Sequence, residues 1–300
     1  MDKKINLFSS VLALIYCKDK TSTFERKYIF FMIIGIDIGS TTTKAVAVQN
    51  GEVIKTIKTK AYDAVTSATG ALGKIIIESN LNISCVEKII ITGAGALKIN
   101  NEIFGITTHK IDEITAIGIG GMFLSKKENI VIANIGTGTS IIEAKRDKIT
   151  HIGGTGMGGG TITGLSKELI KTSTFENILK LADEGDLQQV DLLIEDISDS
   201  NISFLNKEAT ASNFGKMLDT AKKEDIALGI VNMVYQVIGV ISVFAAKSRN
   251  IETVIITGNG SNNQIGKKIL KEISIMYNIN FEFPANAEYA TAMGAALSEL

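Results

Sequence analysis

The chain has 300 residues, 45% of them hydrophobic and 21% charged, with a formal net charge of −1. Because 31 basic and 32 acidic residues nearly balance and no long run of Lys or Arg occurs, no nucleic-acid partner is expected. The only cysteines are Cys17 and Cys85, and the only histidines are His109 and His151. This scarcity excludes a disulfide framework and a metal centre built from Cys or His, and it is typical of a cytoplasmic protein.

Two apolar stretches are long enough to be considered as membrane segments. Residues 5–17 follow a Lys pair and resemble the core of a signal peptide, but no small-residue cleavage site follows them. Residues 1–31 are therefore interpreted as an N-terminal extension outside the fold, with a signal peptide as the alternative. The second stretch, Ala227–Ala246, carries Asn232 and Gln236 near its middle, which favours a buried helix over a membrane span.

The fold is predicted to begin with three antiparallel strands. Met32–Ile38 is a β-branched run typical of a strand buried on both faces. Thr43–Val48 and Glu52–Lys58 read as two further strands. They are separated by a segment containing Asn50-Gly51, and both of these residues tolerate the positive φ of a type I′ turn.

Beyond residue 60, helices and strands alternate along the chain. The elements expected are helix Ala61–Glu78, strands Lys88–Thr92 and Thr107–Ile111, helix Glu113–Ser125, strands Ile130–Asn134, Ser140–Arg146 and Lys148–Ile152, helices Gly158–Lys171, Phe175–Asp183 and Asp225–Arg249, strand Thr253–Thr257, helix Asn263–Tyr277, strand Asn280–Phe283 and a helix from Glu288. The order of strand, hairpin and then strand–helix units occurs twice, at 32–111 and at 130–283. It predicts two similar α/β lobes with a cleft between them.

The first motif with chemical content is Gly35–Lys44. A buried strand ends at Asp37 and Ile38 and continues into a glycine and a row of hydroxyl side chains. Successive N–H groups in such a turn form an anion-binding nest, and the carboxylate beside it is the expected Mg²⁺ ligand. The alternative is a Ser/Thr-rich hairpin with a helical cap. The residues expected to contact phosphate or metal are Asp37, Gly39, Ser40, Thr41, Thr42 and Lys44.

The second motif, Asn134–Ser140, repeats this arrangement between another buried strand and a hairpin. Its expected phosphate contacts are Gly136, Thr137, Gly138 and Thr139. Neither loop is a Walker A sequence, since no G-x-x-x-x-G-K-[ST] pattern occurs in the chain. Two facing hairpins, one from each lobe, predict a clamp around a polyphosphate.

The third motif is the glycine-rich run Gly153–Thr161, which leads into a helix. Gly154, Gly156 and Gly159 satisfy the dinucleotide-binding pattern literally, but a lone match is weak and this one follows a hairpin in the middle of the chain. The run is interpreted as main chain and a helix N-terminus that pack against nucleotide.

Together these motifs resemble the ASKHA superfamily, which includes sugar kinases, actin and heat-shock ATPases, and more closely the type II pantothenate kinases. The resemblance covers about residues 32–300. The stretches that carry it are Gly35–Lys44, Lys110–Gly120, Ala133–Ser140, Gly153–Gly164, Thr210–Gly215 and Gly294–Leu297.

The resemblance implies two duplicated ribonuclease-H-like lobes of the actin-like ATPase type with a nucleotide cleft between them. The lobes are expected at residues 32–126, joined by the C-terminal helix 286–300, and at residues 127–285. It also implies a cytoplasmic homodimer that uses ATP and Mg²⁺ to phosphorylate pantothenate, the first step of coenzyme A biosynthesis, without a membrane partner.

The resemblance nominates Glu113 as the general base, because a hydroxyl that attacks a phosphoryl group must lose a proton. The alternative is that Asp112 and Glu113 only favour a helix N-terminus. The implied nucleotide contacts are Thr137, Gly158, Gly159, Gly160, Thr161, Ile162, Thr163, Phe175, Gly258 and Ser261. For Phe175, a core position on an amphipathic helix is the alternative.

The implied substrate contacts are His151 and Ala211. Where the family usually has an Arg just before the glycine-rich run, this chain has His151. Arg binds a carboxylate through two hydrogen bonds and a permanent charge, whereas neutral His offers one donor. Pantothenate is therefore held differently, or the acceptor is another small hydroxyl compound, or His151 simply ends a strand on the solvent side.

Two further functions compete with the kinase. The first is an activator ATPase of a 2-hydroxyacyl-CoA dehydratase, whose type resembles Gly35–Lys44 but bridges an iron–sulfur cluster with two Cys from each subunit. Cys85 is the only thiol within the expected fold, so a dimer would lack the four thiolates. The second is a nucleotide-binding sensor in which Glu113 is structural.

Overall fold

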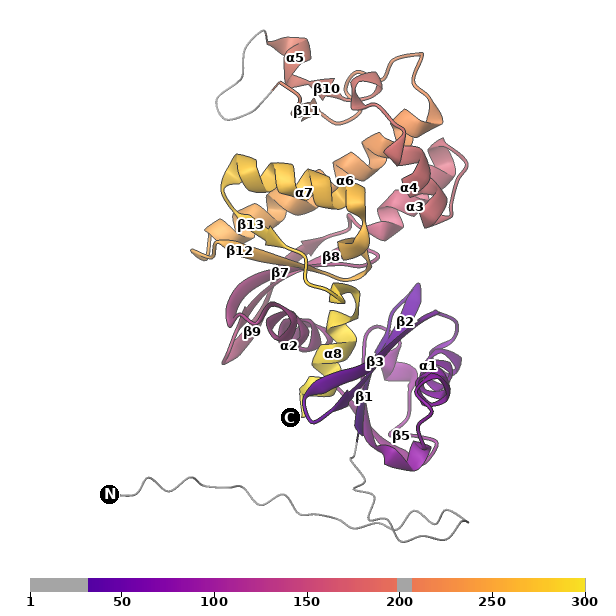
Figure 1. The fold of residues 1–300 in the computed structure, drawn as a ribbon. Coiled ribbons are helices and arrows are strands. Elements are labelled where there is room, and N and C mark those ends of the chain that lie inside the picture. Colours follow the sequence, from indigo (N-terminus) through magenta and orange to yellow (C-terminus); the bar gives the residue numbers. More distant parts are fainter. Residues whose placement is uncertain (1–31, 199–206, 300) are drawn as a thin grey trace, which may run out of the picture.

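The computed structural model describes residues 32–198 and 207–299. The N-terminal extension predicted for residues 1–31, including Cys17 and the apolar stretch 5–17, lies outside the described residues. Two mixed β-sheets, each covered by helices, form the body of the protein, and a small two-stranded sheet lies at one end (Figure 1). The two similar α/β lobes expected from the sequence are present.

The first sheet has six strands in the order β3-β2-β1-β4-β6-β5. Its strands are β1 (Met32–Ile38), β2 (Thr42–Gln49), β3 (Glu52–Lys60), β4 (Val86–Thr92), β5 (Glu102–Ile103) and β6 (Ile106–Lys110). The first three strands are antiparallel, and β4 runs parallel to β1. Asn50 and Gly51 have φ angles of 51° and 79°, so the turn between β2 and β3 has the positive φ values that the sequence predicted.

The second sheet repeats this arrangement with five strands in the order β13-β12-β7-β8-β9. Its strands are β7 (Asn129–Ile135), β8 (Thr139–Lys145), β9 (Lys148–Thr155), β12 (Thr253–Thr257) and β13 (Asn280–Glu282). As in the first sheet, three antiparallel strands are followed by parallel ones. A small separate sheet pairs β10 (Leu192–Leu193) with β11 (Thr210–Ser212), two strands that the sequence patterns did not predict.

The helices are α1 (Ala64–Glu78), α2 (Glu113–Ser125), α3 (Gly159–Leu169), α4 (Phe175–Asp183), α5 (Ile194–Ile197), α6 (Lys223–Lys247), α7 (Gln264–Tyr277) and α8 (Ala290–Leu297). Five of these helices start one to three residues away from the expected positions, and the starts of α1 and α8 have a visible cause. Helix α1 begins after Asp63, whose carboxylate accepts a hydrogen bond from the Thr66 N–H at 3.0 Å and caps the helix. Helix α8 begins at Ala290 instead of Glu288, because Asn286 is left-handed and the 3₁₀ turn Ala287–Tyr289 comes first.

Helix α6 is the one described helix long and apolar enough to cross a membrane, and 61% of its most apolar window is buried inside the protein. Its core positions include Ile230, Val234 and Ile238, each 0% exposed. Its two central polar residues are also paired: Asn232 donates to the Asp191 carboxylate at 2.8 Å, and Gln236 accepts from Asn213. The prediction of a buried helix is confirmed, and the polar pairs explain why polar residues occur there.

Helices α2 and α8 cross at the junction of the two sheets (Figure 1). A Cβ on Gly120 would lie 1.9 Å from the Ala290 carbonyl oxygen, and one on Gly294 would lie 1.8 Å from that of Ala116. Only glycine permits so close an approach of two helix backbones. This crossing places the N-terminus of α2 at the mouth of the space between the sheets.

Candidate active site

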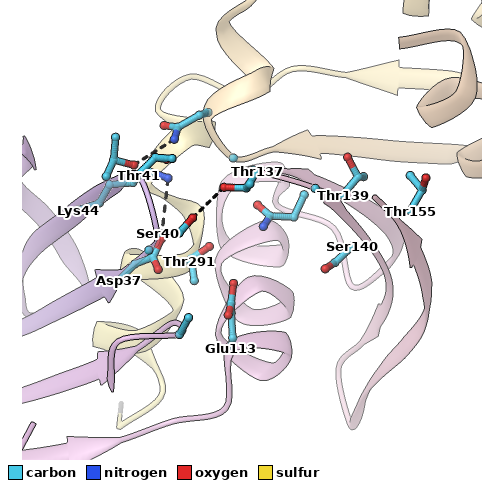
Figure 2. Close-up of a pocket in the computed structure, with 18 residues that line it drawn as sticks. Asp37, Ser40, Thr41, Lys44, Glu113, Thr137, Thr139, Ser140, Thr155 and Thr291 are labelled. Carbon is cyan, nitrogen blue, oxygen red and sulfur yellow. Dashed lines mark hydrogen bonds and ion pairs between the residues drawn. The ribbon is translucent and has the colours of Figure 1, made fainter. Parts of the chain in front are cut away.

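One cleft lies between the two sheets and has a volume of about 340 Å³. The C-terminal ends of β1 and β7 lie at this cleft, and each strand is followed there by a Gly/Thr-rich turn (Figure 2). Twelve of the site residues predicted from the sequence line it, namely Asp37, Gly39, Ser40, Thr41, Thr42, Lys44, Glu113, Gly136, Thr137, Gly138, Thr139 and Gly258. Residues 100 positions apart in the chain therefore share one cavity.

The two Gly/Thr turns meet across this cleft. The hydroxyl groups of Ser40 and Thr137 share a hydrogen bond of 2.9 Å, drawn as a dashed line in Figure 2. The amide of Asn259, in the second lobe, donates to the Thr42 hydroxyl at 3.1 Å. Hydroxyl and amide side chains from both sides thus converge, which suits a polyanion such as a triphosphate.

Two opposite charges are buried on the first-lobe side. Asp37 on β1 and Lys44 on β2 are register partners, with carboxylate and ammonium 3.8 Å apart and exposures of 8% and 5%. Burial raises the pKa of Asp37 to about 6, with the Lys44 charge lowering it and Glu113 raising it. Burial also lowers the pKa of Lys44, and the Asp37 charge counteracts this. Burial therefore disfavours the charged forms of both groups, while their mutual attraction favours them.

Glu113 and its neighbour Asp112 have separate roles at the start of α2. The Asp112 carboxylate accepts a hydrogen bond from the Thr115 N–H at 2.9 Å and caps the helix. Glu113 lines the cleft and points toward the space between the Gly/Thr turns (Figure 2). Burial raises its pKa, the Asp112 charge adds to this, and Lys44 opposes it. The helix-terminus interpretation thus accounts for Asp112 and leaves the Glu113 carboxylate available.

The oxygen donors of the cleft suit a magnesium ion. No group of three or more His, Cys, Asp or Glu side chains in the described part of the chain is arranged to hold a metal. Mg²⁺ instead uses one or two carboxylates, water and substrate phosphates. Asp37 supplies such a carboxylate, and the buried amide oxygen of Asn259, which also lines the cleft, has no partner within the described residues. These donors fit Mg²⁺ bound together with a nucleotide.

The sequence is similar to known kinases over nearly its whole length. A family model described as Fumble matches residues 129–298. The type II pantothenate kinase of Oceanobacillus iheyensis is 31% identical over 275 residues, which cover 88% of this chain and 98% of that protein. The chain belongs to the type II pantothenate kinase family. Membership of this family of ASKHA kinases implies ATP binding and a small-molecule substrate.

Solved structures show that this family member has the actin-like fold. The activator of the 2-hydroxyisocaproyl-CoA dehydratase from Clostridium difficile, solved with bound ADPNP, superposes with a TM-score of 0.61 at 18% identity. The alignment covers 89% of this chain and 94% of that one. The ROK hexokinase from Thermus thermophilus gives a TM-score of 0.53 at 13% identity, covering 89% and 98%. At these identities the likeness concerns the fold alone, and the predicted fold class is confirmed.

The glycine-rich run of this kinase-family chain packs on the second Gly/Thr turn. The N–H groups of Gly159 and Gly160 donate to the carbonyl oxygens of Gly136 and Thr137, both at 2.9 Å. A Cβ on Gly158 would lie 2.5 Å from the Thr137 carbonyl oxygen. None of these three glycines lines the cleft. Their contacts support the turn that does line it.

Five other residues predicted to contact nucleotide form hydrogen bonds to the main chain or pack in the core of the second lobe. The hydroxyl groups of Thr161, Thr163 and Ser261 each donate to a main-chain carbonyl. Ile162 is 1% exposed in the core of the second lobe, and Phe175 packs against the same core. The cleft does not include these five residues. The core alternative considered for Phe175 is therefore what the structure displays, while nucleotide contact by any of them stays a prediction.

The two predicted substrate residues do not line the cleft. His151 is exposed on the edge strand β9, opposite Ile142, so it lies on the sheet face that packs toward α2. Ala211 is exposed on β11 in the small sheet at the far end of the molecule (Figure 1). Ala211 does not line the cleft of its own chain, and its contact with substrate stays a prediction.

Six cleft residues were missed by the sequence reasoning, namely Ala94, Asn134, Ser140, Thr155, Asn259 and Thr291. Asn134, Ser140 and Thr155 fall within the motifs described above, so a broader reading of each motif would have included them. Asn259 follows the predicted Gly258 directly. Ala94 and Thr291 carry no such signal, because only the packing of separate elements brings them to the cleft.

Proposed function

We propose that the protein transfers the γ-phosphoryl group of ATP to the primary hydroxyl group of pantothenate. The observation that carries this proposal is the position of Glu113, whose carboxylate faces the same cleft as both Gly/Thr turns. A nucleotide-binding protein without transfer chemistry needs the turns but has no need for an acid that lines the same cleft at this point.

In this reaction the two turns hold the phosphates and the charged groups balance them. The turns Gly39–Thr42 and Gly136–Thr139 bind phosphate oxygens, with hydroxyl groups such as those of Ser40 and Thr137 as donors, and Lys44 offsets the negative charge. Asp37 would hold Mg²⁺, directly or through water, and the ion would supply positive charge to offset that of the transferred phosphoryl group.

Glu113 accepts the proton of the acceptor hydroxyl. The hydroxyl oxygen bonds to the γ-phosphorus, the bond from that phosphorus to the β–γ bridging oxygen breaks, and ADP leaves. A raised pKa suits this task, because a base is most effective when its pKa lies nearer the working pH. Burial of the carboxylate and the nearby Asp112 charge provide that shift.

We propose pantothenate as the acceptor and a homodimer as the assembly. Support for pantothenate comes from the name of the relative, a type II pantothenate kinase, at 31% identity. His151, on the side of β9 that faces α2, is proposed to contact the pantothenate carboxylate. Ala211 does not line its own cleft, so its contact with substrate is proposed to come from a second subunit of the homodimer.

A coupled assay of ADP release tests the proposal. Pantothenate is compared with sugars, N-acetylhexosamines and no acceptor, with Glu113→Gln as the inactive reference. Strong release that depends on pantothenate supports the assignment. Release with another acceptor would keep the kinase and change its substrate, whereas ATP binding without acceptor-dependent release would indicate a sensor. Stoichiometric iron and sulfide in anaerobically purified protein would instead indicate a dehydratase activator.

The activator alternative is weakened by the number of thiols, because Cys85 is the one cysteine among the described residues and a dimer would supply two thiolates instead of four. This residue ends the 3₁₀ turn Ile83–Cys85, just before β4, where Val86 pairs with Met32 at the start of β1. Asp37 is at the other end of β1, beside Thr92. The described thiol is therefore separated from the cleft by the length of the sheet.

A further inference from the structure

Within the described residues, three polar side-chain contacts near the cleft connect first-lobe strands and turns to segments that pack on the second lobe. Two of them, Ser40 with Thr137 and Thr42 with Asn259, are made by residues that line it. A bound phosphate competes for those same hydroxyl groups, so these contacts must yield to the nucleotide. The third contact is the ion pair of Lys58 and Glu288 at 2.8 Å, and neither residue lines the cleft. This pair is free to persist when the cleft is filled.

Lys58 is coupled directly to the first phosphate turn. It lies on β3 opposite Lys44 on β2, and opposed residues of antiparallel strands point to the same face. Two cations placed this way repel each other unless one of them has a partner. Glu288 supplies that partner for Lys58, as Asp37 does for Lys44.

Glu288 lies at the start of the C-terminal segment that joins the first lobe, but the turn that holds it packs on β12 and the loop after it in the second lobe. It belongs to the 3₁₀ turn Ala287–Tyr289, which precedes α8. In this turn the Ala287 carbonyl accepts a hydrogen bond of 3.1 Å from the N–H of Gly258, a cleft residue at the end of β12. One ion pair therefore connects the strand pair that carries Lys44 to the loop that carries Gly258 and Asn259.

The surroundings favour a lasting interaction. The side chains of Lys58 and Glu288 are 39% and 17% exposed, so the carboxylate is largely removed from water and salt screens it less than a surface pair. The other charged groups near Lys44 are Asp37 on β1 and Glu113 on α2. Both of these face into the cleft, which leaves Glu288 to hold Lys58.

We propose that Lys58 and Glu288 are positioning residues for the phosphoryl transfer, whose ion pair holds the two phosphate turns at their working separation with or without nucleotide. They touch neither nucleotide nor acceptor and act through Lys44 and Gly258. Their loss lets the lobes separate, so it weakens nucleotide binding while the chemical groups remain intact.

The test uses Lys58→Met, Glu288→Gln and the double variant, with Lys55→Met as the matched control. Lys55 lies on the same strand and pairs with Glu78 at 3.2 Å, with both residues in the first lobe. The dissociation constant of a fluorescent ATP analogue and hydrogen exchange of segments 39–42 and 136–139 without nucleotide are measured. Neither readout depends on the identity of the acceptor, so failure here is distinct from failure of the proposed function.

Each single variant is expected to raise the dissociation constant about threefold to tenfold, the range for a half-buried ion pair, and to speed exchange in both turns. The double variant is expected to match the single ones, because either loss already breaks the pair. kcat at saturating ATP is expected to stay near that of the wild type, while KM for ATP rises. Unchanged binding and exchange, additive effects, or an equal change in Lys55→Met would overturn the proposal.

Discussion

The two Gly/Thr turns are alike in sequence but unlike in electrostatics. Every charged residue that lines the cleft in the described chain precedes β7, namely Asp37, Lys44 and Glu113. The second lobe contributes amide, hydroxyl and glycine groups, such as Asn134, Thr137 and Gly138, and carries no formal charge there. The first lobe thus supplies the charged groups of the cleft, and the second lobe supplies uncharged hydrogen-bonding groups and glycines.

The difference reflects two ways of building a site. In the first lobe, neighbouring strands hold Asp37 against Lys44, and burial shifts both pKa values. In the second lobe, the glycine-rich run supports the turn through main-chain hydrogen bonds from Gly159 and Gly160. Changes to the charged cleft residues of the first lobe should therefore affect the chemical step, and changes to the glycine-supported turn of the second lobe should affect nucleotide binding.

The largest effect is expected for Glu113→Gln. The amide keeps the shape of the side chain but cannot accept the hydroxyl proton, so kcat should fall about 10²- to 10⁴-fold. The affinity for ATP, measured by calorimetry or with a fluorescent analogue, should change little because the turns remain. Asp112→Asn is the matched control, since asparagine still caps α2. Full turnover by Glu113→Gln would show that charge on this side is not used for chemistry.

The next effect concerns Asp37 and Mg²⁺. Because the pKa of Asp37 is raised to about 6, kcat/KM should fall as the pH decreases through about 6, where the carboxylate becomes protonated and loses its metal. Since protons and Mg²⁺ compete for the Asp37 carboxylate, higher free Mg²⁺ should move this acidic decrease in kcat/KM to lower pH. A decrease in kcat/KM caused by protonation of Glu113 would not respond to Mg²⁺. Profiles of kcat/KM against pH at two Mg²⁺ concentrations therefore distinguish Asp37 from Glu113. Asp37→Asn should lower activity about 10- to 100-fold.

A second-lobe change of intermediate size is Gly158→Ala. Its Cβ would lie 2.5 Å from the Thr137 carbonyl oxygen, so the second turn must shift, and the dissociation constant of ATP should rise about tenfold. The control is Gly156→Ala in the same run, where a Cβ would meet nothing within 4 Å. A large loss of kcat with unchanged ATP affinity would contradict the division between the lobes.

The smallest effect is expected for Ser40→Ala. It removes the hydroxyl that bonds to Thr137 across the cleft, a contact that nucleotide replaces. KM for ATP should change about two- to fivefold, as for one neutral hydrogen bond. Thr69→Ala is a suitable control, because its hydroxyl bonds only to main-chain carbonyls of the exposed part of α1. An effect as large as that of Asp37→Asn would mean that the hydroxyl has a role beyond holding phosphate.

The sequence predicted most of the regular elements because their signals are local. The Asn50-Gly51 turn, the buried strand Met32–Ile38 and the helix Glu113–Ser125 can each be recognised without knowledge of the rest of the chain. The small sheet of β10 and β11 was missed, since its strands of two and three residues are too short to show a period. It depends instead on Asp191, a buried carboxylate that accepts hydrogen bonds from Thr210, Phe214 and Asn232.

By itself, the sequence determined the local chemistry of this protein: two Gly/Thr turns after buried strands, an acid at the end of one strand and another at a helix start. Those features follow from neighbouring residues, so a linear pattern records them. The folded arrangement alone brings Ser40 to Thr137, Thr291 and Ala94 to the cleft, and Lys58 to Glu288, which is 230 positions away in the chain. Such contacts depend on how α2 and α8 cross, and a linear pattern does not encode the distance between remote segments.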